Sequence, residues 1–217
     1  MTKSIAIDGP AGAGKSTIAK LLAKKCNYTY VDTGAMFRAM AIYMIDHEVN
    51  PEVEEDLNRA VEGIYVGISY ENQMQHVFLN SVDVTDRLRK EEVGRMASKI
   101  AGNKAVRKKL LDLQREIAAK QDVIMDGRDI GTVVLPNASL KIYLTASVEA
   151  RAKRRFDELV EKKENPNLEE IARDIKERDH RDMTRSEAPL KKAEDAVLVD
   201  SSNMTVEEVV AHIAGMI

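Results

Sequence analysis

The chain has 217 residues, of which 33 are lysine or arginine and 36 are aspartate or glutamate, so its formal net charge is −3. That balance argues against bulk-charge binding to nucleic acid, which needs a basic excess across the domain. The single cysteine, Cys26, excludes an intramolecular disulfide and any metal site that needs several cysteines.

The length predicts one domain with room for a small insert. The apolar stretch near the start is too short for a secretion signal, and no apolar run approaches the roughly 20 residues that span a bilayer. With 4% aromatic residues and no tryptophan, the chain also has little material for stacking nucleic-acid bases. We therefore expect a cytoplasmic monomer with no nucleic-acid or membrane partner.

Short apolar runs alternate with long segments of helical periodicity. The runs lie at residues 4–7, 28–31, 123–125, 141–144 and 197–199. Apolar strands without a polar face are typical of a parallel sheet covered by helices on both sides, so we predict an α/β fold with five parallel strands. Asp8, Asp32 and Asp126 directly follow three of these strands, at the edge where such folds bind ligands.

The loop after the first strand matches the phosphate-binding motif G-x-x-x-x-G-K-[ST] and precedes a helical segment. Its backbone N–H groups would surround the phosphates of a nucleoside triphosphate, and the dipole of the next helix would add positive charge. Lys15 would reach the β- and γ-phosphates, and Ser16 would bind Mg²⁺. The predicted ATP site consists of Gly9, Pro10, Ala11, Gly12, Ala13, Gly14, Lys15, Ser16 and Thr17.

Two further strand-to-helix loops carry an arginine beside glycine and aspartate, at residues 32–38 and 126–132. Arg38 and Arg128 would bind an acceptor phosphate, while Asp129 would accept hydrogen bonds from an amino-bearing base or a sugar. Asp126 resembles an acid that holds a magnesium-bound water. The alternative is that both loops are ordinary turns stabilised by glycine and an Arg–Asp pair.

Residues 63–85 alternate between apolar and polar positions, which predicts a small antiparallel sheet with turns at residues 71–73 and 80–81. Because helical segments lie on both sides of it, we interpret this sheet as an insert in the α/β domain. The insert is either part of a binding site or a solvent-covered decoration.

Residues 151–192 are dense in charge and predict two helices with a break at residues 165–167. Asn167 followed by Glu170 resembles a capping box at the start of the second helix. The apolar face of that helix turns charged in its second half, where it carries Arg178, Asp182 and Arg185, with Arg181 beside them. This pattern indicates either a mobile lid whose arginines cover a phosphate site or a solvent-exposed helix with ion pairs along its surface.

The phosphate-binding loop does not by itself decide the activity. A kinase for a small acceptor needs an acceptor pocket and a closing set of arginines. A kinase for another acceptor, such as a different nucleotide or a cofactor precursor, and a non-catalytic nucleotide switch both stay open on the residues alone.

Four segments, IAIDGPAGAGKST, VDTGAMFRAMA, MDGRDIGTVVLP and IKERDHRDMTR, closely resemble those of the bacterial cytidylate kinases, in the same order and over essentially the whole chain. The resemblance implies a P-loop nucleoside monophosphate kinase fold that uses Mg²⁺ and transfers the γ-phosphoryl group of ATP to CMP or dCMP. It also implies three parts: a core at residues 1–62, 91–150 and 190–217, a monophosphate-binding insert at 63–90 with help from helices up to about 115, and a lid at 151–189.

The same resemblance assigns residues to the transferring phosphates and to CMP. The catalytic set is Lys15, Arg128, Arg178, Arg181 and Arg185. The CMP set is Thr33, Arg38, Ser98, Arg107, Arg128, Asp129, Asp182 and Arg185, in which Ser98 and Arg107 resemble the pyrimidine-reading positions. The family often has serine where Thr33 stands, and the extra methyl group bears on how a 2′-deoxy sugar is accepted.

Overall fold

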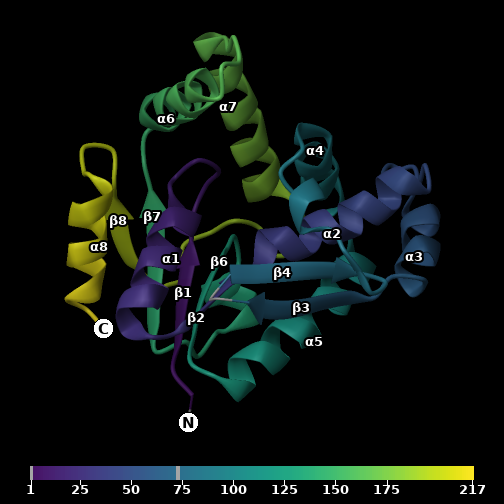
Figure 1. Cartoon of the computed structure of the whole chain (residues 1–217), viewed down its shortest axis with the longest axis horizontal. Helices are drawn as coiled ribbons and strands as arrows, with labels where there is room; N and C mark the ends of the chain where they lie inside the picture. Colours follow the sequence, from purple (N-terminus) through teal and green to yellow (C-terminus); the bar gives the residue numbers. More distant parts are fainter. Residues whose placement is uncertain (1, 72–73) are drawn as a thin grey trace.

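The computed structural model describes residues 2–71 and 74–217, which form a parallel sheet flanked by helices, a small antiparallel sheet and a helical hairpin (Figure 1). The elements in chain order are β1 Ser4–Asp8, α1 Lys15–Cys26, β2 Thr29–Asp32, α2 Thr33–Asp46, α3 Glu54–Glu62, β3 Val66–Glu71, β4 Met74–Leu79, β5 Val82–Asp83, the 3₁₀ turn η1 Thr85–Arg87, α4 Glu91–Ile100, α5 Lys104–Lys120, β6 Val123–Gly127, the π-helical turn η2 Ile130–Val134, β7 Leu140–Thr145, α6 Val148–Glu161, α7 Leu168–Thr184, β8 Val197–Asp200 and α8 Val206–Ala214. No helix in the described ranges is long and apolar enough to span a membrane.

The five-stranded sheet has the order β2-β6-β1-β7-β8, and all its strand pairs are parallel. Alternate side chains of β1 divide the core: Ile5 and Ile7 belong to the apolar cluster that includes α1 and α8, whereas Ala6 belongs to the cluster that includes α2 and α5. Burial on both faces explains why the strands are almost continuously apolar. The predicted α/β class and the five parallel strands are confirmed.

The second sheet, β3-β4-β5, is antiparallel, as the alternating pattern predicts. Asn80 and Ser81 have φ angles of 47° and 69°, which is the left-handed conformation of a tight hairpin turn. The other predicted turn centres on residues 72–73, which lie outside the described residues. Gln75 of β4 accepts a hydrogen bond from the N–H of Asp32 at 2.9 Å and donates one to its carbonyl at 3.2 Å, so this sheet is fixed to the carboxyl end of β2.

Helices α6 and α7 pack against each other as a hairpin above the carboxyl ends of the parallel strands (Figure 1). The Asn167 side chain accepts hydrogen bonds from the N–H groups of Glu169 at 2.9 Å and Glu170 at 3.3 Å, so it caps α7 as predicted. The reciprocal bond from the Glu170 side chain is not among the bonds of the described residues, so only half of the predicted capping box forms.

Candidate active site

The phosphate-binding loop between β1 and α1 has a backbone that requires glycine. A Cβ on Gly9, which has φ 152°, would lie 1.9 Å from the carbonyl oxygen of Leu144. Gly12 has φ 75°, and a Cβ there would lie 3.3 Å from the Cβ of Arg151. The loop therefore bends tightly over β7 and under α6 and presents the N-terminus of α1, the end of the helix that attracts anions.

Within the loop, Lys15 is buried, and its ammonium group donates a hydrogen bond of 2.7 Å to the carbonyl of Pro10. Ala11 and Ala13 are buried with it, whereas Ser16 and Thr17 are exposed at the first turn of α1. The side chain that would reach the phosphates thus lies inside the loop itself.

Asp126, at the end of β6, joins several groups of the site. Its carboxylate accepts hydrogen bonds from the Ser16 hydroxyl at 2.8 Å and the Tyr30 hydroxyl at 3.0 Å, and its backbone carbonyl accepts one from the buried Thr33 hydroxyl at 2.8 Å. Burial and the negative charge of Asp32 raise the pKa of Asp126 to about 6. A nearby cation would favour its ionised form.

The donor set of Ser16 and Asp126 fits Mg²⁺, which takes oxygen ligands and is usually held by one or two protein groups together with phosphate oxygens. Among the described residues, no group of three or more His, Cys, Asp or Glu side chains lies close enough together to hold a metal ion. This donor set would therefore suit a Mg²⁺ ion whose other ligands come from a nucleotide.

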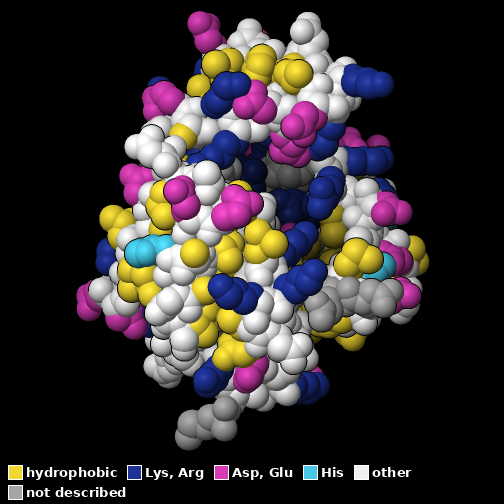
Figure 2. All heavy atoms as spheres, turned by 60° about the vertical axis from the view of Figure 1, so that its left-hand side comes forward, with side chains coloured by type: hydrophobic (Ala, Val, Ile, Leu, Met, Phe, Trp, Pro, Cys, Tyr) yellow, Lys and Arg dark blue, Asp and Glu magenta, His cyan; other side chains and the backbone are white. Residues whose placement is uncertain are grey.

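Positive charges gather in the space between this loop and α7. Burial and the charge of Arg128 lower the pKa of Lys15 and lower that of Arg178 to about 10. The Nε atom of Arg178 is buried and has no hydrogen-bond partner among the described residues. Cations that destabilise each other in this way mark a place where an anion would bind. Figure 2 shows a hollow beneath the α6–α7 hairpin with lysine and arginine side chains on its walls.

A second group of residues pairs arginines with buried acids. Arg107 contacts Asp129, and Arg128 donates from Nε to Asp182 at 2.8 Å. Arg185 lies 3.6 Å from Asp129 and 4.0 Å from Asp182, and its guanidinium group also donates to the carbonyl of Ala188. These five side chains come from α5, the loop after β6 and the end of α7, so the network joins three distant segments.

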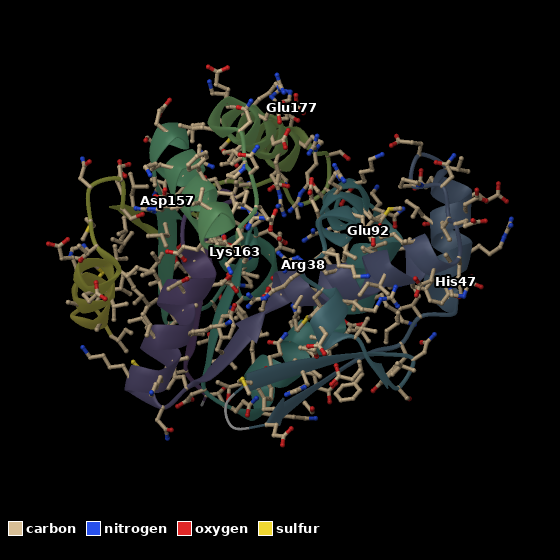
Figure 3. All side chains as sticks on the ribbon, turned by 45° about the horizontal axis from the view of Figure 1, so that its top comes forward. Arg38, His47, Glu92, Asp157, Lys163 and Glu177 are labelled. Atoms are coloured by element: carbon tan, nitrogen blue, oxygen red, sulfur yellow. The ribbon has the colours of Figure 1, made fainter. Side chains whose placement is uncertain are left out.

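The other predicted site residues, Arg38, Ser98 and Arg181, lie in different surroundings. Arg38 lies near the centre of the molecule, below the hairpin (Figure 3), 3.8 Å from Asp32, whose carboxylate also caps α2 by accepting from the N–H of Ala35. The Ser98 hydroxyl is buried and lacks a hydrogen-bond partner among the described residues. Arg181 is exposed on α7, unlike Lys15, which is buried, and unlike Arg128 and Arg178, which are half-buried.

The family model for cytidylate kinase matches residues 5–217. The chain belongs to the cytidylate kinase family. It is 46% identical to the cytidylate kinase of Fusobacterium nucleatum subsp. nucleatum over 97% of this chain and 94% of that protein. It is 47% identical to that of Carboxydothermus hydrogenoformans over 98% and 96%, and 48% identical to that of Caldicellulosiruptor saccharolyticus over 97% and 93%.

The fold also resembles that of a solved structure outside the cytidylate kinase family. The shikimate kinase of Bacteroides thetaiotaomicron is 12% identical, aligns over 99% of this chain and 97% of that one, and has a TM-score of 0.50. At that identity the likeness concerns the fold alone, and it agrees with the parallel sheet flanked by helices described above.

Sequence reasoning missed the role of Asp8 in this member of the cytidylate kinase family. The buried Asp8 carboxylate accepts hydrogen bonds from the N–H groups of Ile130 at 2.8 Å and Gly131 at 2.7 Å. These bonds hold the turn that follows Arg128 and Asp129. The position of Asp8 at a strand end was a signal that it lies at the site edge, but its partners lie 122 and 123 residues away in sequence.

Asp8 should make stability depend on pH. Burial raises its pKa to about 6, above its ordinary value of 3.8, so the folded protein binds a proton more tightly than the unfolded chain does. The stability that this proton contributes is fully present below pH 3.8 and is lost as the pH rises through about 6. We expect the difference in unfolding free energy, wild type minus Asp8→Asn, to fall by up to about 3 kcal/mol across this range in urea titrations. An unchanged difference would contradict the raised pKa.

Proposed function

We propose that this protein transfers the γ-phosphoryl group of ATP to CMP or dCMP, which yields ADP and CDP or dCDP. The observation that carries the proposal is the cluster of the buried Lys15 and the half-buried Arg128 and Arg178 between the phosphate-binding loop and α7, in a chain of this family. Such a cluster suits phosphoryl transfer, in which the protein mainly positions the reactants and neutralises charge.

On the donor side, the loop at residues 9–17 would hold the phosphates of ATP through its backbone N–H groups. Lys15 would exchange its bond with Pro10 for the β- and γ-phosphates. Ser16, with Asp126 behind it, would hold Mg²⁺, which neutralises charge on the phosphates when it is bound. Arg178 and Arg128 would bind the transferring group, and Arg181 would join them only after a movement of α7.

On the acceptor side, Arg38, Arg128 and Arg185 would bind the monophosphate. Asp182 would orient Arg128, to which it is already hydrogen-bonded. Because the Thr33 hydroxyl donates to the carbonyl of Asp126, its lone pairs, and not its proton, are left for CMP.

The pyrimidine would lie near Ser98, Arg107 and Asp129. Ser98 supports this placement because its buried hydroxyl has no partner among the described residues. Asp129 fixes the guanidinium group of Arg107, and an aspartate can accept from the exocyclic amino group that distinguishes cytosine from uracil.

We assign the parts of the chain accordingly. Residues 63–90, with the helices up to about 115, would bind the monophosphate; residues 151–189 would be the lid; and residues 1–62, 91–150 and 190–217 would form the core. Closure of the lid would exclude water, which otherwise competes with CMP for the phosphoryl group. No general base is needed from the chain.

ADP formation from ATP and Mg²⁺, measured with CMP, dCMP, UMP and AMP in turn, tests this function. We expect turnover with CMP or dCMP to exceed turnover with AMP by at least about 10²-fold, because a site built to bind polar groups strongly rejects a base that leaves them unpaired. Preference for another acceptor would indicate a different kinase, and ATP binding without turnover would indicate a nucleotide switch.

A further inference from the structure

The base of the proposed lid contacts the phosphate-binding loop through one buried ion pair. Arg151, in the first turn of α6, and Asp179, in the second half of α7, lie 2.6 Å apart between Nη1 and Oδ2. Their side chains are only 5% and 10% exposed. Neither residue has a place in the phosphate and CMP sets proposed above.

Both side chains form hydrogen bonds with the backbone of Ala11 in the phosphate-binding loop. Arg151 Nη1 donates to the carbonyl of Ala11 at 2.8 Å, and Asp179 Oδ1 accepts from the N–H of Ala11 at 3.3 Å. A further hydrogen bond fixes the Arg151 side chain, because its Nε atom donates to the carbonyl of Ala146 at 2.9 Å. The Cβ of Arg151 also occupies the space that a side chain at Gly12 would need. Each of the two lid helices therefore binds Ala11: α6 binds its carbonyl through Arg151, and α7 binds its N–H group through Asp179.

We propose that Arg151 and Asp179 are positioning residues that set the lid relative to the phosphate-binding loop for phosphoryl transfer; the inference rests on the proposed function. Asp179 directly follows Arg178 and lies three residues before Asp182 on α7. A clamp between Asp179 and Ala11 therefore fixes where these two residues of α7 stand relative to Lys15 and Arg128.

The clamp acts through geometry and not through contact with substrate. The Nε atom of Arg151 is directed to the carbonyl of Ala146, and its Nη1 atom to the carbonyl of Ala11 and to Asp179. Its loss should move the α7 groups relative to the loop, and a shift of about 1 Å in a phosphoryl-transfer site costs up to about 10²-fold in rate. It should also let water reach the donor phosphate, because the lid would close less tightly.

The main test is the double variant Arg151→Met/Asp179→Leu. Removing one partner of a buried pair leaves an uncompensated charge, whereas replacing both with apolar side chains of similar size is often neutral for stability. We expect kcat for CDP formation to fall about 10²-fold. The KM for CMP should rise by a smaller factor than that by which kcat falls, because neither Arg151 nor Asp179 belongs to the proposed CMP set. ATP hydrolysis without acceptor should rise relative to transfer.

The matched control is Arg155→Met/Glu158→Leu, which removes the exposed Arg155–Glu158 ion pair of the same helix α6 and the exposed contact of Glu158 with Lys162. This control should keep the wild-type kcat and the wild-type ratio of hydrolysis to transfer. A folded Arg151→Met/Asp179→Leu variant that matches it in both quantities would overturn the proposal.

A second variant covers the case in which the double variant does not fold. Asp179→Asn keeps the size of the side chain and an oxygen for Ala11, but it loses the charge that holds Arg151. In the ligand-free protein we expect faster amide hydrogen exchange at the loop around Ala11 in Asp179→Asn than in wild type, and unchanged exchange at this loop would overturn the proposal. The exchange experiment needs no turnover, so its outcome is separate from the assay that tests the kinase activity itself.

Discussion

Replacing Lys15 with alanine should lower the rate of CMP-dependent ADP formation by about 10³-fold or more, because it removes a charge that stabilises the transferring phosphoryl group. Lys15 is only 6% exposed at the base of the loop, where Pro10 is the one hydrogen-bond partner of its ammonium group among the described residues. Burial and the charge of Arg128 already lower its pKa, so the free protein gains little stability from this charge. The fold should therefore survive the substitution.

A coupled assay of ADP formation and a thermal unfolding curve check both halves of this expectation. Lys24→Ala is a suitable control, since Lys24 is an exposed lysine on the same helix α1. It should leave the rate and the unfolding temperature unchanged. If Lys15→Ala kept activity within tenfold of wild type, the assignment of this loop to the donor phosphates would be wrong.

Replacing Arg178 with alanine should lower kcat by about 10³-fold, the smaller end of the range for an arginine that stabilises transferring phosphate. The buried Nε of Arg178 has no hydrogen-bond partner in the described part of the chain, and burial and Arg128 lower the pKa of this guanidinium group to about 10, so it is suited to bind an anion. Arg178→Lys should recover little activity, because lysine lacks the planar fork that binds two phosphate oxygens.

Steady-state kinetics decide how Arg178 acts. We expect kcat and kcat/KM to fall together, which is the signature of an interaction made in the transition state. The exposed Arg173 of the same helix provides the control variant Arg173→Ala. A rise in KM for ATP with unchanged kcat would show instead that Arg178 binds the ground state and the transition state equally.

Much of this architecture could be predicted from the sequence because its signals are local. The glycines of the phosphate-binding loop, the apolar strands and the alternation at residues 63–85 each follow from backbone geometry and burial within a short segment. The fold class and the antiparallel sheet were confirmed on that basis.

The arrangement of the charged residues could not be predicted in the same way. The sequence of α7 suits a solvated helix or a lid equally well, yet Asp179 and Asp182 are buried whereas Arg181 is exposed. The difference depends on partners far along the chain, such as Arg151 for Asp179 and Arg128 for Asp182. The roles of these residues in CMP and ATP binding stay predictions.

Quantitative detection of CDP and ADP after incubation with ATP, Mg²⁺ and CMP tests the central claim most directly. Because the phosphoryl group should pass from ATP to CMP with water excluded, we expect one CDP for each ADP, and almost no ADP when CMP is left out. ADP formed without CDP, or at the same rate with and without CMP, would contradict the assignment of this cleft to phosphoryl transfer between nucleotides.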